Sequence, residues 1–422
     1  MAEHPSLFQQ SLESFTEARE RILTEAFHAA LAGNDTSSDV KTTSKPINLT
    51  AHDPIRYVGD MFAWVHSSAV TELETADALF VAGDDSTEGM RLDRPVDPNR
   101  LLTHAGEEVS DAGWTLGDLV DRSIVGVSRM LRQRVEQVIH SNEELTVAYQ
   151  LVALIRFYSV TLEKLVGKQS ILRDGIEDLK SHALRQFRAL VRDHITHNQM
   201  GLQPVPSDLG PPLFFHDALA QLETILKIYD ASLSASNDRD HDVSFILSEA
   251  FDPCMAACKN LTKSLEHPED VIFFVNCALT ATKTLRKFDF ANKHTDALQI
   301  EVTSEAERLV EYQTDVFRVS SGLDRLLDQR DKISENTLEQ ASQQLDQFLP
   351  SALMDAMETM GPLLDVQLSR KIIEAAADKF CDDFELLERN IDRLDRETSE
   401  SHRTRLRSFF PRTIAEIRTL LT

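Results

Sequence analysis

Glycine is scarce in this chain of 422 residues, which contains 14 glycines, about half the usual share. Glycine-rich phosphate loops and multi-turn β architectures both need more. Neither a Gly-x-Ser-x-Gly elbow nor a Gly-x-Gly-x-x-Gly fingerprint is present. Gly167-Lys-Gln-Ser170 is not a phosphate-binding loop, because Gln169 stands where Ser or Thr must follow the lysine. No sequence motif identifies a nucleophile or a general base, and we expect a protein that is not an enzyme and that binds no cofactor.

Cysteine is also rare, and the four cysteines are Cys254, Cys258, Cys277 and Cys381. Such sparse usage in apolar surroundings indicates a reducing compartment rather than a disulfide framework. The four-residue spacing of Cys254 and Cys258 suits neither a redox Cys-x-x-Cys pair nor a zinc knuckle. We therefore expect both side chains to be small buried hydrophobes.

Positive charge is in short supply, with 44 Lys and Arg against 69 Asp and Glu and a net charge of −25. A field of that sign repels nucleic acid and the anionic cytosolic leaflet, so any membrane contact is expected to be indirect. No stretch approaches the ~20 consecutive apolar residues of a transmembrane helix, and the N-terminus has no signal-peptide pattern. These features predict a cytosolic protein, or a peripheral one on the cytosolic face of a membrane.

Helical periodicity dominates what is there, and no convincing period-two alternation is found. The predicted fold class is all-α. The expected helices cover about 6–32, 53–81, 115–140, 143–166, 170–197, 213–233, 241–264, 268–287, 291–328, 337–348, 350–359 and 362–397, and a last one begins at 411.

Turn-rich and proline-rich stretches divide these helices. Residues 33–52 and 83–113 are predicted flexible loops within an N-terminal helical bundle at 1–198. Prolines 204, 206, 211 and 212 forbid a helix, so 199–212 is predicted to be a hinge. Residues 213–422 then form C-terminal helical bundles.

Two of the expected helices show which face should be buried. In the first, the predicted apolar face is Phe8, Leu12, Phe15, Ile22, Ala26 and Ala30, and Gly33 ends the helix. In the 291–328 helix, two overlapping seams run through Val302, Leu309, Val316 and Leu323 and through Ala306, Tyr312, Val319, Leu326 and Leu327. Because a coiled coil buries one seam only, this helix should pack between two neighbours.

The most informative stretch is HDPIRYVGDMFAWVH at residues 52–66. Asp53 is placed to be the N-cap of a helix, and Pro54 suits its first position. The apolar stripe of that helix is predicted to be Ile55, Val58, Phe62, Val65 and Ala69, widened by Tyr57, Met61 and Trp64. The physical interpretation is a packed scaffold helix.

The same run resembles the pattern HDPxRYVGDMxAWxH of the conserved oligomeric Golgi complex subunit 6 family. Other segments are similar to that family in the same order: RQRVEQVI at 132–139, LIRFY at 154–158, PSDLGP at 206–211, FDF at 288–290 followed by LQ at 298–299, and the tail from Pro411. The resemblance spans nearly the whole chain and corresponds to the C-terminal portion of the family.

The resemblance implies an elongated rod of stacked helical bundles, like other multisubunit tethering (CATCHR-type) subunits. It implies a non-catalytic subunit on the cytosolic face of Golgi membranes, acting in intra-Golgi retrograde vesicle tethering. Partners would be the fifth, seventh and eighth sibling subunits and SNARE proteins. The motif residues are His52, Asp53, Pro54, Arg56, Tyr57, Gly59, Asp60 and Trp64. Alternatives are a subunit of another helical tether such as exocyst, and an all-α metal-dependent hydrolase.

Clusters of basic residues are the other candidates for function in so acidic a chain. Arg185, Arg188 and Arg192 share one helical stripe, and Arg403, Arg405, Arg407 and Arg412 surround Phe409 and Phe410. Either cluster could bind an acidic partner helix or an anionic head group, or be an ordinary exposed face partnered by carboxylates.

Two further motifs have ordinary structural interpretations. His194 and His197 have a spacing compatible with a metal, yet no third ligand is evident, so we expect a polar helix end. The final helix has Ile414, Ile417 and Leu421 on one side and should dock on the bundle. Its alternative role is as a ligand for the groove of a partner.

Overall fold

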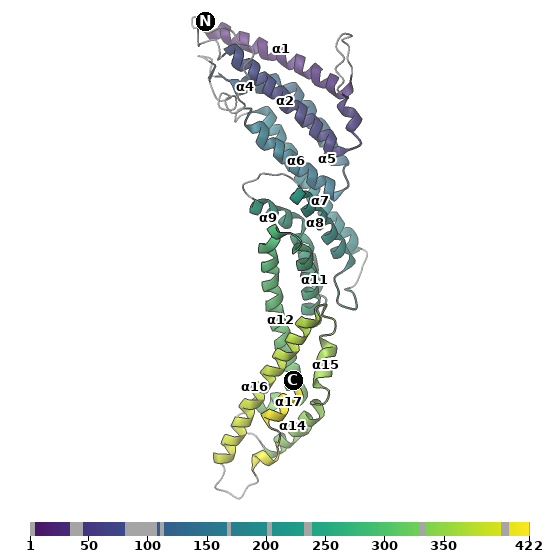
Figure 1. The fold of residues 1–422 in the computed structure, drawn as a ribbon, viewed down its shortest axis with the longest axis vertical. Coiled ribbons are helices and arrows are strands. Elements are labelled where there is room, and N and C mark those ends of the chain that lie inside the picture. The colour runs from purple at the N-terminus through teal and green to yellow at the C-terminus, as the bar shows by residue number, and fades with distance from the viewer. Residues whose placement is uncertain are drawn as a thin grey trace. The chain divides into compact units, whose positions relative to one another are not determined.

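The computed structural model describes residues 5–33, 45–80, 108–109, 114–166, 170–200, 205–231, 239–328, 334–397 and 405–421. The chain forms two compact units, Met1–Arg192 and Asp193–Thr422. The described residues are almost entirely helical (Figure 1), which confirms the all-α prediction. Most of the predicted loops at 33–52 and 83–113 lie outside the described residues. The predicted division at 198 and the hinge at 199–212 stay predictions.

Unit 1 is a helical bundle with one short hairpin-like pair of strands. Its elements are α1 (Pro5–Ala32), the 3₁₀ turn η1 (Ile47–Thr50), α2 (Pro54–Phe80), β1 (Glu108–Val109), β2 (Trp114–Thr115), α4 (Leu116–Ser123), α5 (Val125–Ser141), α6 (Leu145–Glu163) and α7 (Ile171–Met200), which continues into unit 2. β1 and β2 pair antiparallel, and neither strand was predicted. The core lies where α1 and α2 pack against α4 and α5, and α6 packs on α2.

Unit 2 contains α8 (Leu213–Ala231), α9 (Arg239–Ala250), α10 (Asp252–Thr262), α11 (Glu269–Leu285), η2 (Asp289–Ala291), α12 (Asn292–Ser321), α13 (Leu323–Asp328), α14 (Glu335–Phe348), α15 (Ala352–Thr359), α16 (Val366–Glu397), η3 (Leu406–Ser408) and α17 (Ile414–Leu421). α12 packs against α11 on one side and against α14 and α16 on another. This confirms that the 291–328 region needs more than one neighbour.

Three expected helices are broken where local backbone departs from helical geometry. Ile124 separates α4 from α5, and Phe251 separates α9 from α10. Gly322 ends α12 with a φ of +76°, a left-handed conformation that favours glycine. The predicted continuous helix at 291–328 is therefore wrong. The apolar periodicity of the sequence continues past Gly322, but the left-handed backbone of Gly322 ends the helix there.

Two predicted buried faces need correction. In α1 the buried positions are Leu12, Leu23, Phe27 and Leu31, whereas Ile22 and Ala26 are exposed. The observed face buries Leu23, Phe27 and Leu31, which together have more apolar area than Ile22, Ala26 and Ala30. Arg19 of α1 forms an ion pair with the buried Glu72 of α2. In the 291–328 region Ala306 and Leu326 are buried as predicted, whereas Val319 is 64% exposed and Phe317, which the prediction left out, is buried.

α6 is the one helix in the described ranges that is long and apolar enough, by length and composition alone, to cross a membrane. In unit 1 it packs on α2 and buries Ala148, Leu151 and Ile155. About 33% of this apolar span is buried, and Phe157 and Val160 on its other side are 61% and 56% exposed.

Candidate interaction surfaces

The HDP stretch begins α2 as a capped helix. The Asp53 carboxylate Oδ1 accepts a hydrogen bond from the Arg56 amide at 3.1 Å, and the Asp53 carbonyl accepts from the Tyr57 amide at 2.9 Å. Pro54 is the first helical residue, where its missing N–H costs nothing. The prediction of an N-cap at Asp53 is confirmed.

Tyr57 joins three elements of unit 1. Its ring is 7% exposed, and its hydroxyl donates to Asn48 Oδ1 at 3.3 Å. The same hydroxyl accepts from Arg134 Nη1 of α5 at 2.9 Å. Because the contacts come from η1, α2 and α5, this one phenol fixes the position of the α2 N-terminus against its neighbours.

The remaining motif polar groups also make local contacts. Asp60 accepts from Thr50 Oγ1 at 3.3 Å and lies 3.8 Å from Arg56 Nε, while His52 Nδ1 lies 3.0 Å from the Leu49 carbonyl. Arg56 and His52 are exposed. These side chains tie η1 to α2, and their role in the family motif stays a prediction.

The aromatic motif side chains pack against rings on other helices. Trp64 lies with its ring centroid 4.9 Å from that of Phe27 in α1. Phe62 stacks on Tyr158 of α6 at 4.9 Å with an interplanar angle of 11°. Burial, and secondarily the charge of Asp60, raise the pKa of the Tyr158 phenol. Gly59 faces α6 as well, and a Cβ there would meet Leu154 at 3.9 Å, which is ordinary contact.

The arginine stripe, meaning Arg185, Arg188 and Arg192, lies on α7 with all three side chains exposed. Phe187 and Val191 on the opposite side are buried in unit 1. The structure therefore places the predicted candidates together on the solvent face of one helix.

The basic cluster near the C-terminus is largely engaged within unit 2. Arg407 pairs with Glu388 of α16, and Arg412 Nε lies 2.9 Å from Asp346 Oδ1 of α14. Arg403 lies outside the described residues. The ordinary interpretation, a face partnered by carboxylates, fits Arg407 and Arg412, although those carboxylates come from other helices.

The final helix docks on the bundle, as predicted. Ile417 is fully buried and Leu421 is 3% exposed, both against α16. Just before the helix, Phe410 is fully buried and stacks on Phe384 with centroids 5.6 Å apart.

The cysteine candidates are buried thiols, and the side chain of His197 lies outside the described residues. Within the described ranges, no group of three or more His, Cys, Asp or Glu is placed to hold a metal ion. Cys254 and Cys258 are buried on α10, as expected. Burial raises the pKa of the Cys254 thiol to about 12, and contact with Cys277 raises that of Cys258.

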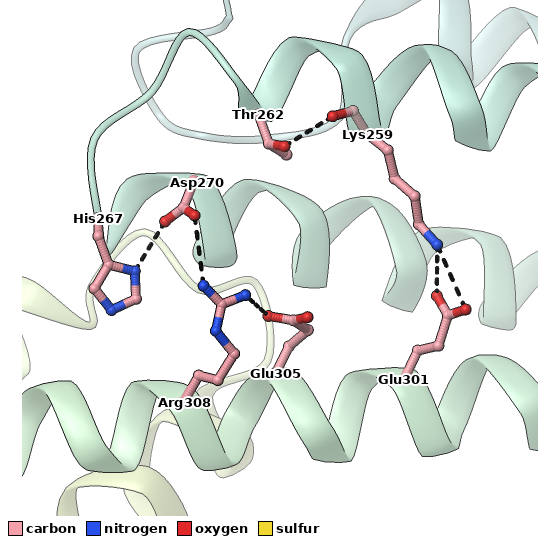
Figure 2. A network of polar contacts seen from close by, with 7 residues as sticks. All are labelled: Lys259, Thr262, His267, Asp270, Glu301, Glu305 and Arg308. Carbon is pink, nitrogen blue, oxygen red and sulfur yellow. Dashed lines mark hydrogen bonds and ion pairs between the residues drawn. The ribbon is translucent and has the colours of Figure 1, made fainter.

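A polar groove in unit 2, which sequence reasoning missed, lies between α12 and the α10–α11 pair (Figure 2). Its volume is about 370 Å³, with Val271 and Phe274 as apolar lining. On one side Lys259 Nζ of α10 lies 3.1 Å from Glu301 Oε2 of α12 and 5.1 Å from the centre of the Phe274 ring.

The other end of the groove has a second ion-pair group. Arg308 Nη1 lies 2.6 Å from Glu305 on its own helix, and Arg308 Nη2 lies 3.9 Å from Asp270 of α11. His267 Nδ1 lies 3.0 Å from Asp270 Oδ1. Because Lys259 and Arg308 are each more than half exposed, the pairs contribute little stability. The pairs link α12 to α10 through Glu301 and to α11 through Arg308.

Asn276 of α11 forms a buried polar junction in unit 2. Its Nδ2 donates to the carbonyls of Leu209 and Pro362, each at 2.9 Å, and its Oδ1 accepts from the Leu364 amide at 2.9 Å. Leu209 belongs to the DLGP segment and has a φ of 53°. This segment is thus anchored to α11 and to the turn before α16, a link that spacing in the sequence does not reveal.

Comparison with known proteins gives the family. The family model described as "Conserved Oligomeric Golgi complex subunit 6, C-terminal" matches residues 1–421. The chain belongs to the conserved oligomeric Golgi complex subunit 6 family. The proteins of that name from Chaetomium globosum, Pyricularia oryzae and Sclerotinia sclerotiorum are 44%, 43% and 43% identical to it over its whole length. The chain spans 65%, 64% and 66% of the length of these three relatives.

The fold of this subunit 6 family member resembles that of one solved all-α structure. A solved structure of Exo70 from S. cerevisiae matches 97% of this chain and 75% of that chain, with a TM-score of 0.56 and 12% identity. At that identity the likeness concerns the fold alone. It agrees with the all-α fold, whereas the sequence relatives assign the chain to the conserved oligomeric Golgi complex subunit 6 family.

Proposed function

We propose that this chain acts as a non-catalytic subunit of a Golgi vesicle-tethering complex. The family match over residues 1–421 is the observation that carries the proposal. The subunit would bind the fifth, seventh and eighth sibling subunits and SNARE proteins. It would act in intra-Golgi retrograde transport, held on the cytosolic face of Golgi membranes as a peripheral protein.

The arginine stripe on α7 is the proposed partner contact in unit 1. Its three guanidinium groups are exposed in a chain with a net charge of −25. Guanidinium groups form bidentate hydrogen bonds with carboxylates, so an acidic helix of a partner is the chemistry that fits. The HDP residues are proposed to act indirectly, by holding α2 against η1 and α5.

The test is a pull-down of the purified full-length subunit against each sibling subunit and a panel of SNARE proteins. A triple variant, Arg185→Glu, Arg188→Glu and Arg192→Glu, should lose at least one sibling or SNARE. The matched control reverses three exposed cations of α16 instead: Arg370→Glu, Lys371→Glu and Lys379→Glu. Recovery of no sibling by the unmodified subunit would contradict the proposed function, and equal binding by both variants would contradict the assigned surface.

A further inference from the structure

α15 has an unusual distribution of apolar side chains. Ala352, Ala356 and Met360, at intervals of four, are fully buried toward the bundle. Met354 and Met357 point the other way and are 75% and 57% exposed. A helix in a folded protein usually buries its large apolar side chains and exposes its small ones. The outer face of α15 therefore has the apolar side chains that are typical of a buried face.

The exposed apolar surface continues beyond α15. Leu364 is 57% exposed and Val366, the first residue of α16, is 63% exposed. The Leu364 backbone is fixed by Asn276, since its amide donates to the buried Asn276 Oδ1. We call Met354, Met357, Leu364 and Val366 the α15 patch. It lies on a rigidly anchored part of unit 2, where α15 lies beside α16 (Figure 1).

The charge along α15 and the residues that flank it in sequence has one sign. Residues 334–369 contain no Lys, Arg or His and six acidic residues: Glu335, Glu339, Asp346, Asp355, Glu358 and Asp365. Asp355 and Glu358 are exposed beside the two methionines, and Asp346 is paired with Arg412. Basic residues resume at Arg370, one turn into α16. The patch is thus apolar at its centre and acidic along α15.

We propose that the α15 patch binds an amphipathic helix of a partner protein that has an apolar face and basic flanks. Methionine side chains adapt their shape to different apolar partners and are used at helix-binding surfaces. Asp355 and Glu358 would attract lysines and arginines at the edge of the incoming helix. The same carboxylates, and the net charge of −25, disfavour an anionic membrane and a second copy of this chain. The inference deepens the proposed function by naming the chemistry of one partner segment.

The first experiment uses the full-length subunit and a synthetic amphipathic Leu/Lys helix as the probe. Fluorescence anisotropy should show that Met354→Gln with Met357→Gln weakens binding by at least about tenfold, because the apolar area covered by the helix is lost. Asp355→Lys with Glu358→Lys should weaken it similarly. The matched control, Ile300→Gln with Val319→Gln, removes exposed apolar side chains of α12 (70% and 64% exposed) and should change binding less than about twofold.

Two comparisons complete the binding experiment. A Leu/Lys peptide with the same composition in scrambled order should bind weakly, since it has no apolar face. Thermal unfolding of each variant checks that the fold is intact, which is expected because the changed side chains are exposed. Equal binding by the unmodified chain and by Met354→Gln with Met357→Gln would overturn the inference.

The second experiment places a photo-crosslinking amino acid at position 354 of the full-length subunit, in cells that assemble the complex. The supporting result is a crosslink to a segment with a basic amphipathic pattern in a sibling subunit or SNARE. A crosslink to lipid, or to an acidic segment, would contradict the inference. The two proposals can fail separately. If the pull-down recovers sibling subunits but position 354 crosslinks to lipid or to an acidic segment, the proposed function is supported and the proposal for the α15 patch is wrong.

Discussion

The side-chain amide of Asn276 donates a hydrogen bond of 2.9 Å to the carbonyl of Leu209, 67 residues earlier in the chain. Because Asn276 also binds Pro362 and Leu364, one fully buried amide connects α11 with two turns that have no regular hydrogen-bond ladder of their own. The junction is the strongest single candidate for a residue on which the packing of unit 2 depends.

Asn276→Ala should destabilise unit 2 by about 3 kcal/mol, since two buried carbonyls and one amide lose their partner. Urea unfolding followed by circular dichroism measures the change. The matched control is Asn260→Ala, an exposed asparagine of α10 whose side chain contacts Lys263, and it should cost less than about 0.5 kcal/mol. Similar midpoints for the two variants would show that the junction is unimportant.

The Arg19–Glu72 pair between α1 and α2 gives a second prediction. Glu72 is 4% exposed, and Arg19 contacts both its carboxylate oxygens. Arg19→Met should lower the free energy of unfolding by about 3 kcal/mol, because it leaves a buried carboxylate without its cation. Adding Glu72→Leu should recover most of that loss. A double variant no more stable than Arg19→Met alone would contradict this account.

Two glycines should respond in opposite ways to alanine. At Gly59 a Cβ has ordinary contact, so Gly59→Ala should leave the fold intact and add about 0.5–1 kcal/mol of stability. At Gly126 a Cβ would lie 2.3 Å from Thr24 Oγ1, so Gly126→Ala should destabilise unit 1 by about 1–3 kcal/mol. Thr24→Ala in the same chain should relieve the clash, which thermal unfolding would detect.

The Tyr158 phenol predicts a loss of stability at high pH. Burial and then Asp60 raise its pKa above the ordinary 10.0. The folded chain therefore keeps this proton at a pH where the unfolded chain has released it, and stability falls as pH rises from 10 through the folded pKa. Tyr158→Phe should reduce that fall. The prediction is contradicted if Tyr158→Phe leaves the pH dependence of unfolding above pH 10 unchanged. It is also contradicted if the variant keeps the tyrosinate absorbance change that occurs above the ordinary pKa of 10.0.

The four cysteines should react with a thiol reagent only after unfolding. All are buried, and burial first of all raises the thiol pKa of Cys254 and Cys381, so little thiolate is available to react. The check is the labelling rate in native buffer and in urea. Rapid modification of any one cysteine in the native protein would be the contrary result.

Much of the helical content follows from local signals that sequence contains. Asp53 and Pro54 mark the start of α2, and Gly33 follows α1 with a φ of +72°, so capping chemistry predicts these ends well. The errors occur where distant residues decide. Ile22 has the hydrophobicity of a core residue, but the face of α1 that meets the rest of unit 1 is the one with Leu23, Phe27 and Leu31.

The candidate surfaces were only partly predictable for a similar reason. The arginine stripe could be identified because one helix contains all three residues. The groove between α10, α11 and α12 and the Asn276 junction join residues far apart in sequence, and no spacing rule brings Lys259 to Glu301 or Asn276 to Leu209. Nor does composition distinguish Met354 outside from Met360 inside, since their exposure depends on which side of α15 meets the bundle.

The stacked rings of Phe384 and Phe410 have a practical consequence for anyone who shortens or extends this chain. Removing the residues from 405 onward would expose the ring of Phe384 on α16, which Phe410 covers, and would favour aggregation. A partner that bound the apolar face of α17 would first have to displace Ile417 and Leu421 from their buried positions, and the free energy of that step would reduce its affinity.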